Sequence, residues 1–164
     1  MKKRITNTVL LVILVAVAAF YFKRYRIAPN IAEKRVVFQT PHGLDSLDSF
    51  LDKNLVLIFY AGWCGTCHRE MPGLVQAYAK LKEANFEVIG LTDDREEVID
   101  KFRSNYGIAF PMYKLSGTLQ DVGVYTLPTT FVMNSKGEVV FEHVEYMDWT
   151  DPAVVQEVIQ SARN

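Results

Sequence analysis

The stretch Phe59-Tyr60-Ala61-Gly62-Trp63-Cys64-Gly65-Thr66-Cys67 holds both cysteines of this 164-residue chain. The run Leu55–Tyr60, which leads into it, is almost continuously apolar, and this is the pattern of a central strand covered on both faces. From Cys64 onward, apolar residues recur at helical spacing. The sequence therefore predicts that two thiols lie where a buried strand ends and a helix begins.

The position of the two thiols predicts how they react. Cys64 falls in the first turn of the predicted helix, where unpaired backbone N–H groups and the helix dipole lower the pKa of a thiol. The thiolate is the attacking species, so we expect Cys64 to be the nucleophile. Cys67 lies one helical turn further on the same side, near enough to attack a mixed disulfide on Cys64 and close the Cys64–Cys67 bridge.

A metal site is the alternative for the same pair. Two cysteines would supply half of a zinc site, which needs two further ligands. The histidines His42, His68 and His143 show no paired ligand spacing. We therefore expect a redox disulfide with no metal and no cofactor, and zinc stays as the alternative.

The rest of the chain alternates predicted strands and helices. Asp45 is expected to cap a short helix, and Asp94, with Glu97 three residues on, to open a longer helix that stops at Gly107. This order predicts an α/β fold with a mixed central sheet covered by helices on both faces. Strands are expected at 36–38, 55–60, 86–92, 111–115, 129–133 and 138–143, and helices at 64–85, 94–106 and from 150 onward. The last helix is expected to open at Thr150-Asp151-Pro152, with a cap and a proline in its first turn.

At this point the residues resemble a known family. The quoted stretch resembles the thioredoxin active-site segment, and Leu127-Pro128-Thr129-Thr130-Phe131 resembles the segment that carries the cis-proline of that fold. Cys67-His68-Arg69-Glu70-Met71-Pro72, the extra helix and strand at 94–115 and the N-terminal segment are similar to the membrane-anchored TlpA-like thioredoxins, which include the ResA-type and CcmG-type reductases of cytochrome c maturation. The resemblance covers about residues 36–164 and implies a thioredoxin fold with an inserted helix–strand unit.

The resemblance also implies residues that meet the substrate. Pro128 is expected to be cis and to lie against the sulfur pair, although an ordinary trans turn proline is the alternative. A proline has no N–H to donate, which leaves the segment at Leu127 free to meet an extended substrate chain. Trp63 is expected to contact substrate or shield the pair, and a purely packing role is the alternative. Pro72 is expected to kink the active-site helix.

Glu70 is the expected proton carrier. It lies three residues after Cys67, on the same helical face, and in ResA-like proteins the matching glutamate acts as an acid or base. Ile58 stands where the buried aspartate of thioredoxin would fall, and it cannot ionise. The alternative for Glu70 is an ordinary solvent-exposed glutamate, and His68 is likewise expected to be exposed.

The first 26 residues are expected to be a signal anchor. Basic residues flank an apolar run at about 5–22, which has the minimum length for a membrane-spanning helix. Phe20-Tyr21-Phe22 and the basic residues after them favour a retained anchor over a signal peptide cut near Ala16-Val17-Ala18. We therefore divide the chain into an anchor at 1–26, a linker at 27–35 and a thioredoxin-like domain at 36–164.

The net charge and the expected membrane topology limit the classes of partner. After position 27 the chain carries 19 acidic and 12 basic residues, a net charge of −7, which argues against a nucleic-acid surface. The leading hypothesis is a membrane-tethered thiol-disulfide oxidoreductase, on the outer side of the cytoplasmic membrane. Its expected partners are a disulfide-containing exported protein, with apocytochrome c the substrate class that the family suggests, and an upstream membrane thiol-disulfide reductant.

Two other functions stay open. Sco-like copper metallochaperones share the anchor and fold, but their cysteines resemble a Cys-x-x-x-Cys pair with a distant histidine, whereas this chain has two residues between its thiols. A peroxiredoxin would carry a Thr-x-x-Cys pattern, which precedes neither thiol. Copper binding and peroxide consumption are therefore the measurements that discriminate among the three.

Overall fold

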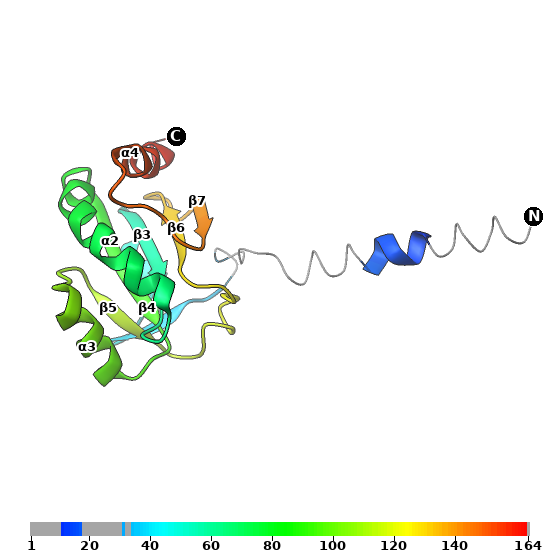
Figure 1. Cartoon of the computed structure of the whole chain (residues 1–164), viewed down its shortest axis with the longest axis horizontal. Helices are drawn as coiled ribbons and strands as arrows, with labels where there is room; N and C mark the ends of the chain where they lie inside the picture. The colour runs from blue at the N-terminus through cyan, green and yellow to red at the C-terminus, as the bar shows by residue number, and fades with distance from the viewer. Residues whose placement is uncertain (1–10, 18–30, 32–33, 164) are drawn as a thin grey trace, which may run out of the picture.

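The computed structural model describes residues 11–17, 31 and 34–163 (Figure 1). Residues 11–17 form a helix whose large apolar side chains are all exposed. Within the described ranges, no helix is both long and apolar enough to cross a membrane. The rest of the expected anchor at 1–26, and most of the expected linker at 27–35, lie outside the described residues.

The described strands form one mixed sheet, as the sequence predicts. Its seven strands run in the order β2-β1-β5-β4-β3-β6-β7. β3, β4 and β5 are parallel to one another, while the other neighbours pair antiparallel. The strands are β1 (Val37–Thr40), β2 (Gly43–Ser46), β3 (Asn54–Phe59), β4 (Phe86–Thr92), β5 (Met112–Leu115), β6 (Thr129–Met133) and β7 (Val139–Val144).

Three α-helices pack on the same face of this sheet: α2 (Gly65–Glu83), α3 (Glu96–Tyr106) and α4 (Pro152–Ser161) (Figure 1). The opposite face is covered by a short 3₁₀ helix at Leu47–Phe50 and by the irregular segment 116–124. The sheet is therefore covered on both faces, as expected, but on the second face by one short 3₁₀ helix and irregular chain instead of α-helices. Residues 116–124 form a series of turns, in which the side chains of Leu119, Val122 and Val124 are buried. Gly123 has a φ of 85°, which favours a turn over a helix.

The pairing of β3 with β6 positions the active site. Each residue from Leu55 to Phe59 is at most 1% exposed, as expected for a central strand. Because β6 is antiparallel to β3, its first residue, Thr129, pairs with Phe59, the last residue of β3. The loop that follows β3 and the loop that precedes β6 therefore meet at one end of the sheet. These are the loops that carry Cys64 and Pro128.

The helix ends confirm some expected caps and correct others. Gly107, in the left-handed conformation at φ 60°, ends α3, and the Asp151 side chain accepts a hydrogen bond from the Ala153 N–H at the start of α4. Asp45, in contrast, lies inside β2 and caps no helix. Arg95 occupies the N-cap position of α3, while the Asp94 carboxylate accepts the N–H of Gly62 at 2.6 Å. Asp94 therefore serves the active-site loop instead of its own helix.

Candidate active site

The two cysteines lie where the sequence predicts, joined as a disulfide. Cys64 is the N-cap of α2, and its Sγ accepts a hydrogen bond from the Cys67 N–H at 3.1 Å. Cys64 is 6% exposed, whereas Cys67 is completely buried. A backbone N–H aimed at the sulfur stabilises negative charge there, so the geometry favours a thiolate on Cys64, the sulfur that an approaching substrate reaches first.

The loop before Cys64 is a tight turn that side chains hold in place. The Cys64 N–H donates to the Ala61 carbonyl at 3.1 Å, which closes the turn around Gly62 and Trp63. His68, expected to be exposed, instead lies half-buried with its Nε2 2.8 Å from the Gly62 carbonyl oxygen. That expectation fails because the side chain folds back across the first turn of α2 rather than extending into water.

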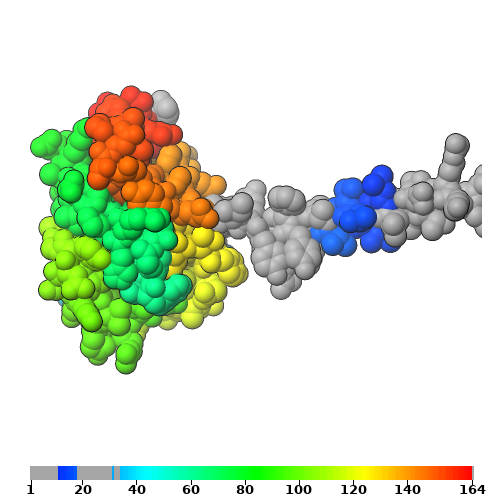
Figure 2. All heavy atoms as spheres, viewed as in Figure 1, coloured from blue at the N-terminus to red at the C-terminus, as the bar shows by residue number. Residues whose placement is uncertain are grey.

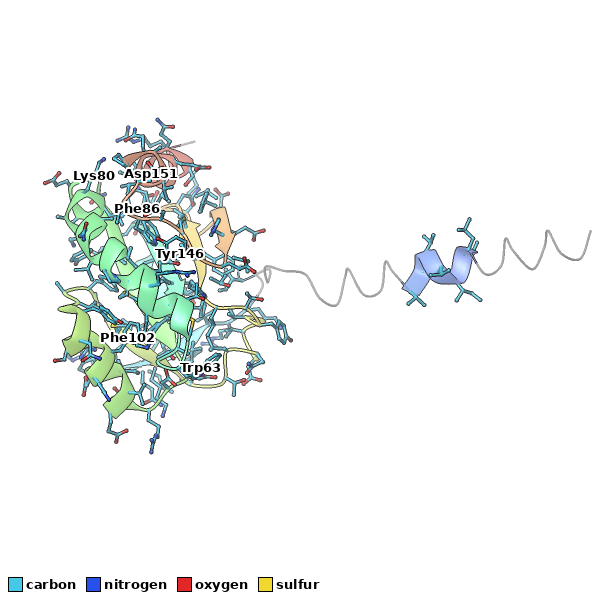
Figure 3. All side chains as sticks on the ribbon, in the orientation of Figure 1. Trp63, Lys80, Phe86, Phe102, Tyr146 and Asp151 are labelled. Atoms are coloured by element: carbon cyan, nitrogen blue, oxygen red, sulfur yellow. A yellow bond between two sulfur atoms is a disulfide. The ribbon has the colours of Figure 1, made fainter. Side chains whose placement is uncertain are left out.

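A groove beside Cys64 contains most of the expected substrate-binding residues. It has a volume of about 380 Å³ and joins the start of α2 to the 119–127 segment, whose yellow spheres border the green of α2 in Figure 2. The Leu127–Pro128 peptide bond is cis, as the resemblance implies. Trp63 is 75% exposed at the beginning of α2 (Figure 3), so it does not pack in the core. The lining residues are Trp63, Cys64, Gly65, Thr66, Leu119, Gln120, Val124, Tyr125, Thr126 and Leu127.

A second groove adjoins the first, sharing Thr66, Thr126 and Leu127 with it. It has a volume of about 540 Å³, and mostly polar residues of α2, of the end of β7 and of the segment after β7 complete its lining: Arg69, His143, Val144, Glu145 and Tyr146. The Arg69 guanidinium lies 4.9 Å from the centre of the Tyr146 ring, beside α2 in Figure 3. The surface around Cys64 is therefore aromatic and apolar on one side and polar on the other.

Sequence reasoning missed several residues of these grooves. Tyr125, 65% exposed, and Tyr146, 37% exposed, are presented to solvent beside the cysteine helix. Both come from loops far along the chain, and only the pairing of β3 with β6 and of β6 with β7 brings them there. The one usable signal was their closeness in sequence to Pro128 and to β7.

Glu70 is buried, which excludes the ordinary solvent-exposed glutamate. It is 1% exposed, and its two carboxylate oxygens accept hydrogen bonds at 2.9 Å from the Met147 N–H and the Trp149 Nε1–H. Burial raises the pKa of the Glu70 carboxyl above its ordinary value, while these two bonds and the nearby His143 oppose that rise. Glu70 therefore joins α2, one turn beyond Cys67, to the segment after β7.

The structure brings Cys64, Cys67, Trp63, Leu127 and Pro128 to one end of the sheet, with Glu70 on the buried side of α2. In the described parts of the chain, no group of three histidine, cysteine or carboxylate side chains is arranged to hold a metal ion. A cis-proline beside a disulfide at the start of a helix, on a mixed sheet, defines the class. This is a thioredoxin-fold protein with a redox-active Cys-x-x-Cys pair.

Comparison with known proteins gives the family. The AhpC/TSA family model matches residues 26–142. The thiol-disulfide oxidoreductase ResA of Oceanobacillus iheyensis is 30% identical over 155 residues, which cover 84% of this chain and 81% of that protein. A ResA of Bacillus thuringiensis is 33% identical over 99 residues, 58% of this chain and 57% of that protein. The chain therefore belongs to the AhpC/TSA family, as a thiol-disulfide oxidoreductase of the ResA/CcmG type.

Solved structures agree on the fold. The thioredoxin domain of a thiol-disulfide oxidoreductase from Bacteroides vulgatus superposes with a TM-score of 0.66 at 22% identity, covering 80% of this chain and 98% of that one. StoA from Bacillus subtilis superposes with a TM-score of 0.60 at 18% identity, covering 82% and 98%. The thioredoxin fold expected from the two motifs is thereby confirmed.

Proposed function

We propose that this protein is tethered to the outer side of the cytoplasmic membrane and reduces disulfides in exported proteins. The observation that carries the proposal is the position of Cys64, whose sulfur lies at the N-cap of α2, accepts the Cys67 N–H and opens onto a groove lined by exposed aromatic rings. These features suit a thiolate that attacks a polypeptide disulfide.

The reaction runs in two exchanges. The Cys64 thiolate attacks one sulfur of the substrate disulfide, which forms a mixed disulfide and releases the other substrate sulfur as a thiolate. Cys67 then loses its proton and attacks the Cys64 sulfur, which closes the Cys64–Cys67 bridge and frees the second substrate thiolate. The substrate has gained two electrons, and a membrane thiol-disulfide reductant returns two electrons to the bridge.

The groove accounts for substrate binding. Leu127, which a cis bond joins to Pro128, lines both grooves. A substrate chain in extended conformation would pass over it beside Cys64. Trp63 and Tyr125 offer exposed aromatic faces beside Cys64. Aromatic rings contact many side chains without strict geometry, which suits a protein substrate. Apocytochrome c is the first candidate, because the chain is of the ResA/CcmG type and the reductases of that type act in cytochrome c maturation.

Glu70 is proposed to exchange the proton of Cys67. Cys67 is buried, so its thiol cannot pass a proton directly to bulk water. Glu70 lies one turn away on α2, and burial raises the pKa of its carboxyl toward the range where a general acid or base works at neutral pH. Both its oxygens accept N–H bonds, so the ionised form has partners ready when the proton leaves.

The tether is proposed from the N-terminal pattern. The run at about 5–22 lies between basic clusters, and its described part, 11–17, is a helix with exposed apolar side chains. Such a surface suits lipid rather than water. With the N-terminus in the cytoplasm, residues 36–164 would lie outside the membrane, where exported proteins carry disulfides.

The function is tested by comparing three activities of the reduced, purified protein. We expect it to reduce a model protein disulfide stoichiometrically, with two electrons transferred per bridge formed, and Cys64→Ser to abolish this. Hydrogen peroxide should be consumed far more slowly. Peroxide consumption at an equal rate would support a peroxidase. Tight equimolar copper binding that His143→Ala abolishes would support a metallochaperone. His143 is the histidine to test because it lines the second groove, which adjoins the groove beside Cys64.

A further inference from the structure

Both backbone groups of Gly62, two residues before Cys64, are held by side chains. The Gly62 N–H donates to the Asp94 carboxylate at 2.6 Å, and the Gly62 carbonyl lies 2.8 Å from His68 Nε2. The Asp94 carboxylate also accepts the Thr92 hydroxyl at 3.1 Å, which fixes it at the end of β4. Gly62 is therefore held from α2 on one side and from the β4–α3 connection on the other.

The contacts of His68 require a proton on its Nε2 atom. A carbonyl oxygen only accepts, so Nε2 carries the proton that it donates to Gly62. Nδ1 lies 2.6 Å from the Tyr106 hydroxyl, a group that can donate to this nitrogen or accept from it. The imidazole also packs against the rings of Phe102 and Tyr106, with centroids 4.8 and 5.7 Å away. Figure 3 shows Phe102 on α3, on the side that faces α2.

The inserted helix α3 and the residue Asp94 before it thus contact the cysteine turn or His68 at three points. Tyr106 acts through His68, and Asp94, just before α3, binds Gly62 directly. Val98 lies so close to Gly62 that a Cβ on residue 62 would collide with its side chain. A glycine is therefore required at this position, because the helix and the turn are in direct contact.

We propose that His68 is a positioning residue that holds the turn Ala61–Cys64 in the geometry that stabilises the Cys64 thiolate. The inference rests on the proposed role of Cys64 as the attacking thiol. The Cys67 N–H reaches the Cys64 sulfur only while the N-cap keeps its extended backbone, at φ −82° and ψ 103°. In the oxidised protein the disulfide itself restrains Cys64. In the reduced protein that bond is absent, and the hydrogen bonds to Gly62 keep the turn in place.

The loss of His68 is therefore expected to harm the reduced state more than the oxidised state. His68→Phe keeps an aromatic ring against Phe102 but removes both hydrogen bonds. In the full-length protein we expect iodoacetamide to alkylate Cys64 about tenfold more slowly at pH 7, because the thiol pKa rises. The equilibrium with a thiol buffer should shift about tenfold toward the disulfide, which corresponds to about 30 mV toward a more negative potential.

Matched variants separate positioning from simple stability. His68→Gln keeps an N–H donor for Gly62 and should recover most of the alkylation rate, while Tyr106→Phe should shift it in the same direction as His68→Phe by a smaller factor. His42→Gln, in the exposed β1–β2 turn, should change nothing. If His68→Phe lowers the Tm of both redox states equally and leaves the alkylation profile and potential unchanged, the inference is wrong. Labelling mapped to Cys67 in the unaltered protein would instead contradict the proposed function.

Discussion

The carboxylate of Glu70 lies in an environment that shapes both stability and chemistry. It is buried between α2 and the segment after β7, with an N–H donor on each oxygen. An unpaired buried donor costs more free energy than a surface hydrogen bond contributes. Glu70 therefore holds the Met147–Trp149 segment against α2, in addition to its proposed role in proton exchange.

Glu70→Gln should destabilise the protein, because the amide can accept from one of the two donors but presents its own N–H₂ to the other. We expect a loss of about 2 kcal/mol in the free energy of unfolding, measured by urea titration. Glu157→Gln, on an exposed position of α4, is the matched control and should stay within about 0.5 kcal/mol. An equal effect of the two substitutions would argue against the buried hydrogen bonds.

The raised pKa of Glu70 also predicts how stability depends on pH. A carboxyl whose pKa is higher in the folded than in the unfolded state binds more protons when folded, so its contribution is present at low pH and is lost as pH rises through the folded pKa. The stability difference between the unaltered protein and Glu70→Gln should therefore shrink as pH rises from about 4 to 8. A difference that grows over this range would show that the hydrogen bonds outweigh burial.

The same substitution should alter the pH profile of disulfide reduction, if Glu70 exchanges the proton of Cys67. The measurement is the rate of reduction of a model disulfide from about pH 5 to 9 by Glu70→Gln and by Glu157→Gln. Unchanged profiles for both variants would leave Glu70 with its structural role alone.

Tyr60 contrasts with Glu70, because its buried polar group lacks the hydrogen bonds that the Glu70 carboxylate accepts. Its side chain is completely buried against Phe102, and its hydroxyl has no hydrogen-bond partner among the described residues. Burial is the largest cause that raises the pKa of this hydroxyl. Tyr60→Phe should therefore be neutral or stabilising by up to about 1 kcal/mol, as thermal unfolding would measure. A loss of more than 1 kcal/mol would point to an ordered water or another partner on the hydroxyl.

At the scale of elements, α4 closes the helical face of the sheet and depends on its first turn. The Asp151 carboxylate accepts the Ala153 N–H at 2.8 Å, with Pro152 at the first helical position. Asp151→Ala should cost about 1 kcal/mol of unfolding free energy, and Asp151→Asn much less, because asparagine also caps well. Equal losses in urea titrations of the two variants would mean that charge, rather than the cap, is what matters.

The elements that the sequence predicted well are those with local signals. The apolar run that ends at Tyr60 predicted β3. Gly107 predicted the end of α3, and the Asp151 cap predicted the start of α4. The misassigned residues act over long sequence separations. Asp94 binds Gly62 across 32 residues, and His68 binds Tyr106 across 38. A capping motif looks identical whether its carboxylate turns inward to its own helix or outward to another loop, so only the fold decides.

The residues of the candidate site likewise fall into those with a local sequence signal and those whose partners are distant in sequence. The positions of Cys64 and Cys67 followed from the strand and helix that flank them, and the cis-proline followed from family resemblance. The helical face of Glu70 indicated its burial. Its hydrogen-bond partners could not be predicted, because Trp149 lies 79 residues away. Side-chain partners across such distances depend on packing that no local pattern encodes.

In the full-length protein, a redox domain is proposed to be joined to an N-terminal membrane tether. We expect the full-length protein to stay in the membrane fraction after a carbonate wash, and a variant without residues 1–26 to leave it. Intact mass should retain the N-terminus, and added protease should reach residues 36–164 in spheroplasts. Release of the full-length chain by carbonate, or a mass that shows cleavage near Ala18, would contradict a retained anchor.

Cys64 is proposed to attack a disulfide in an exported protein, and Cys67 is proposed then to release that protein. The most direct measurement is mass spectrometry of complexes trapped in cells that produce Cys67→Ala, with Cys64→Ala as the matched control. We expect a mixed disulfide between Cys64 and a cysteine of an exported protein, absent from the control. Trapping by Cys64→Ala through Cys67, or partners confined to the cytoplasm, would contradict it.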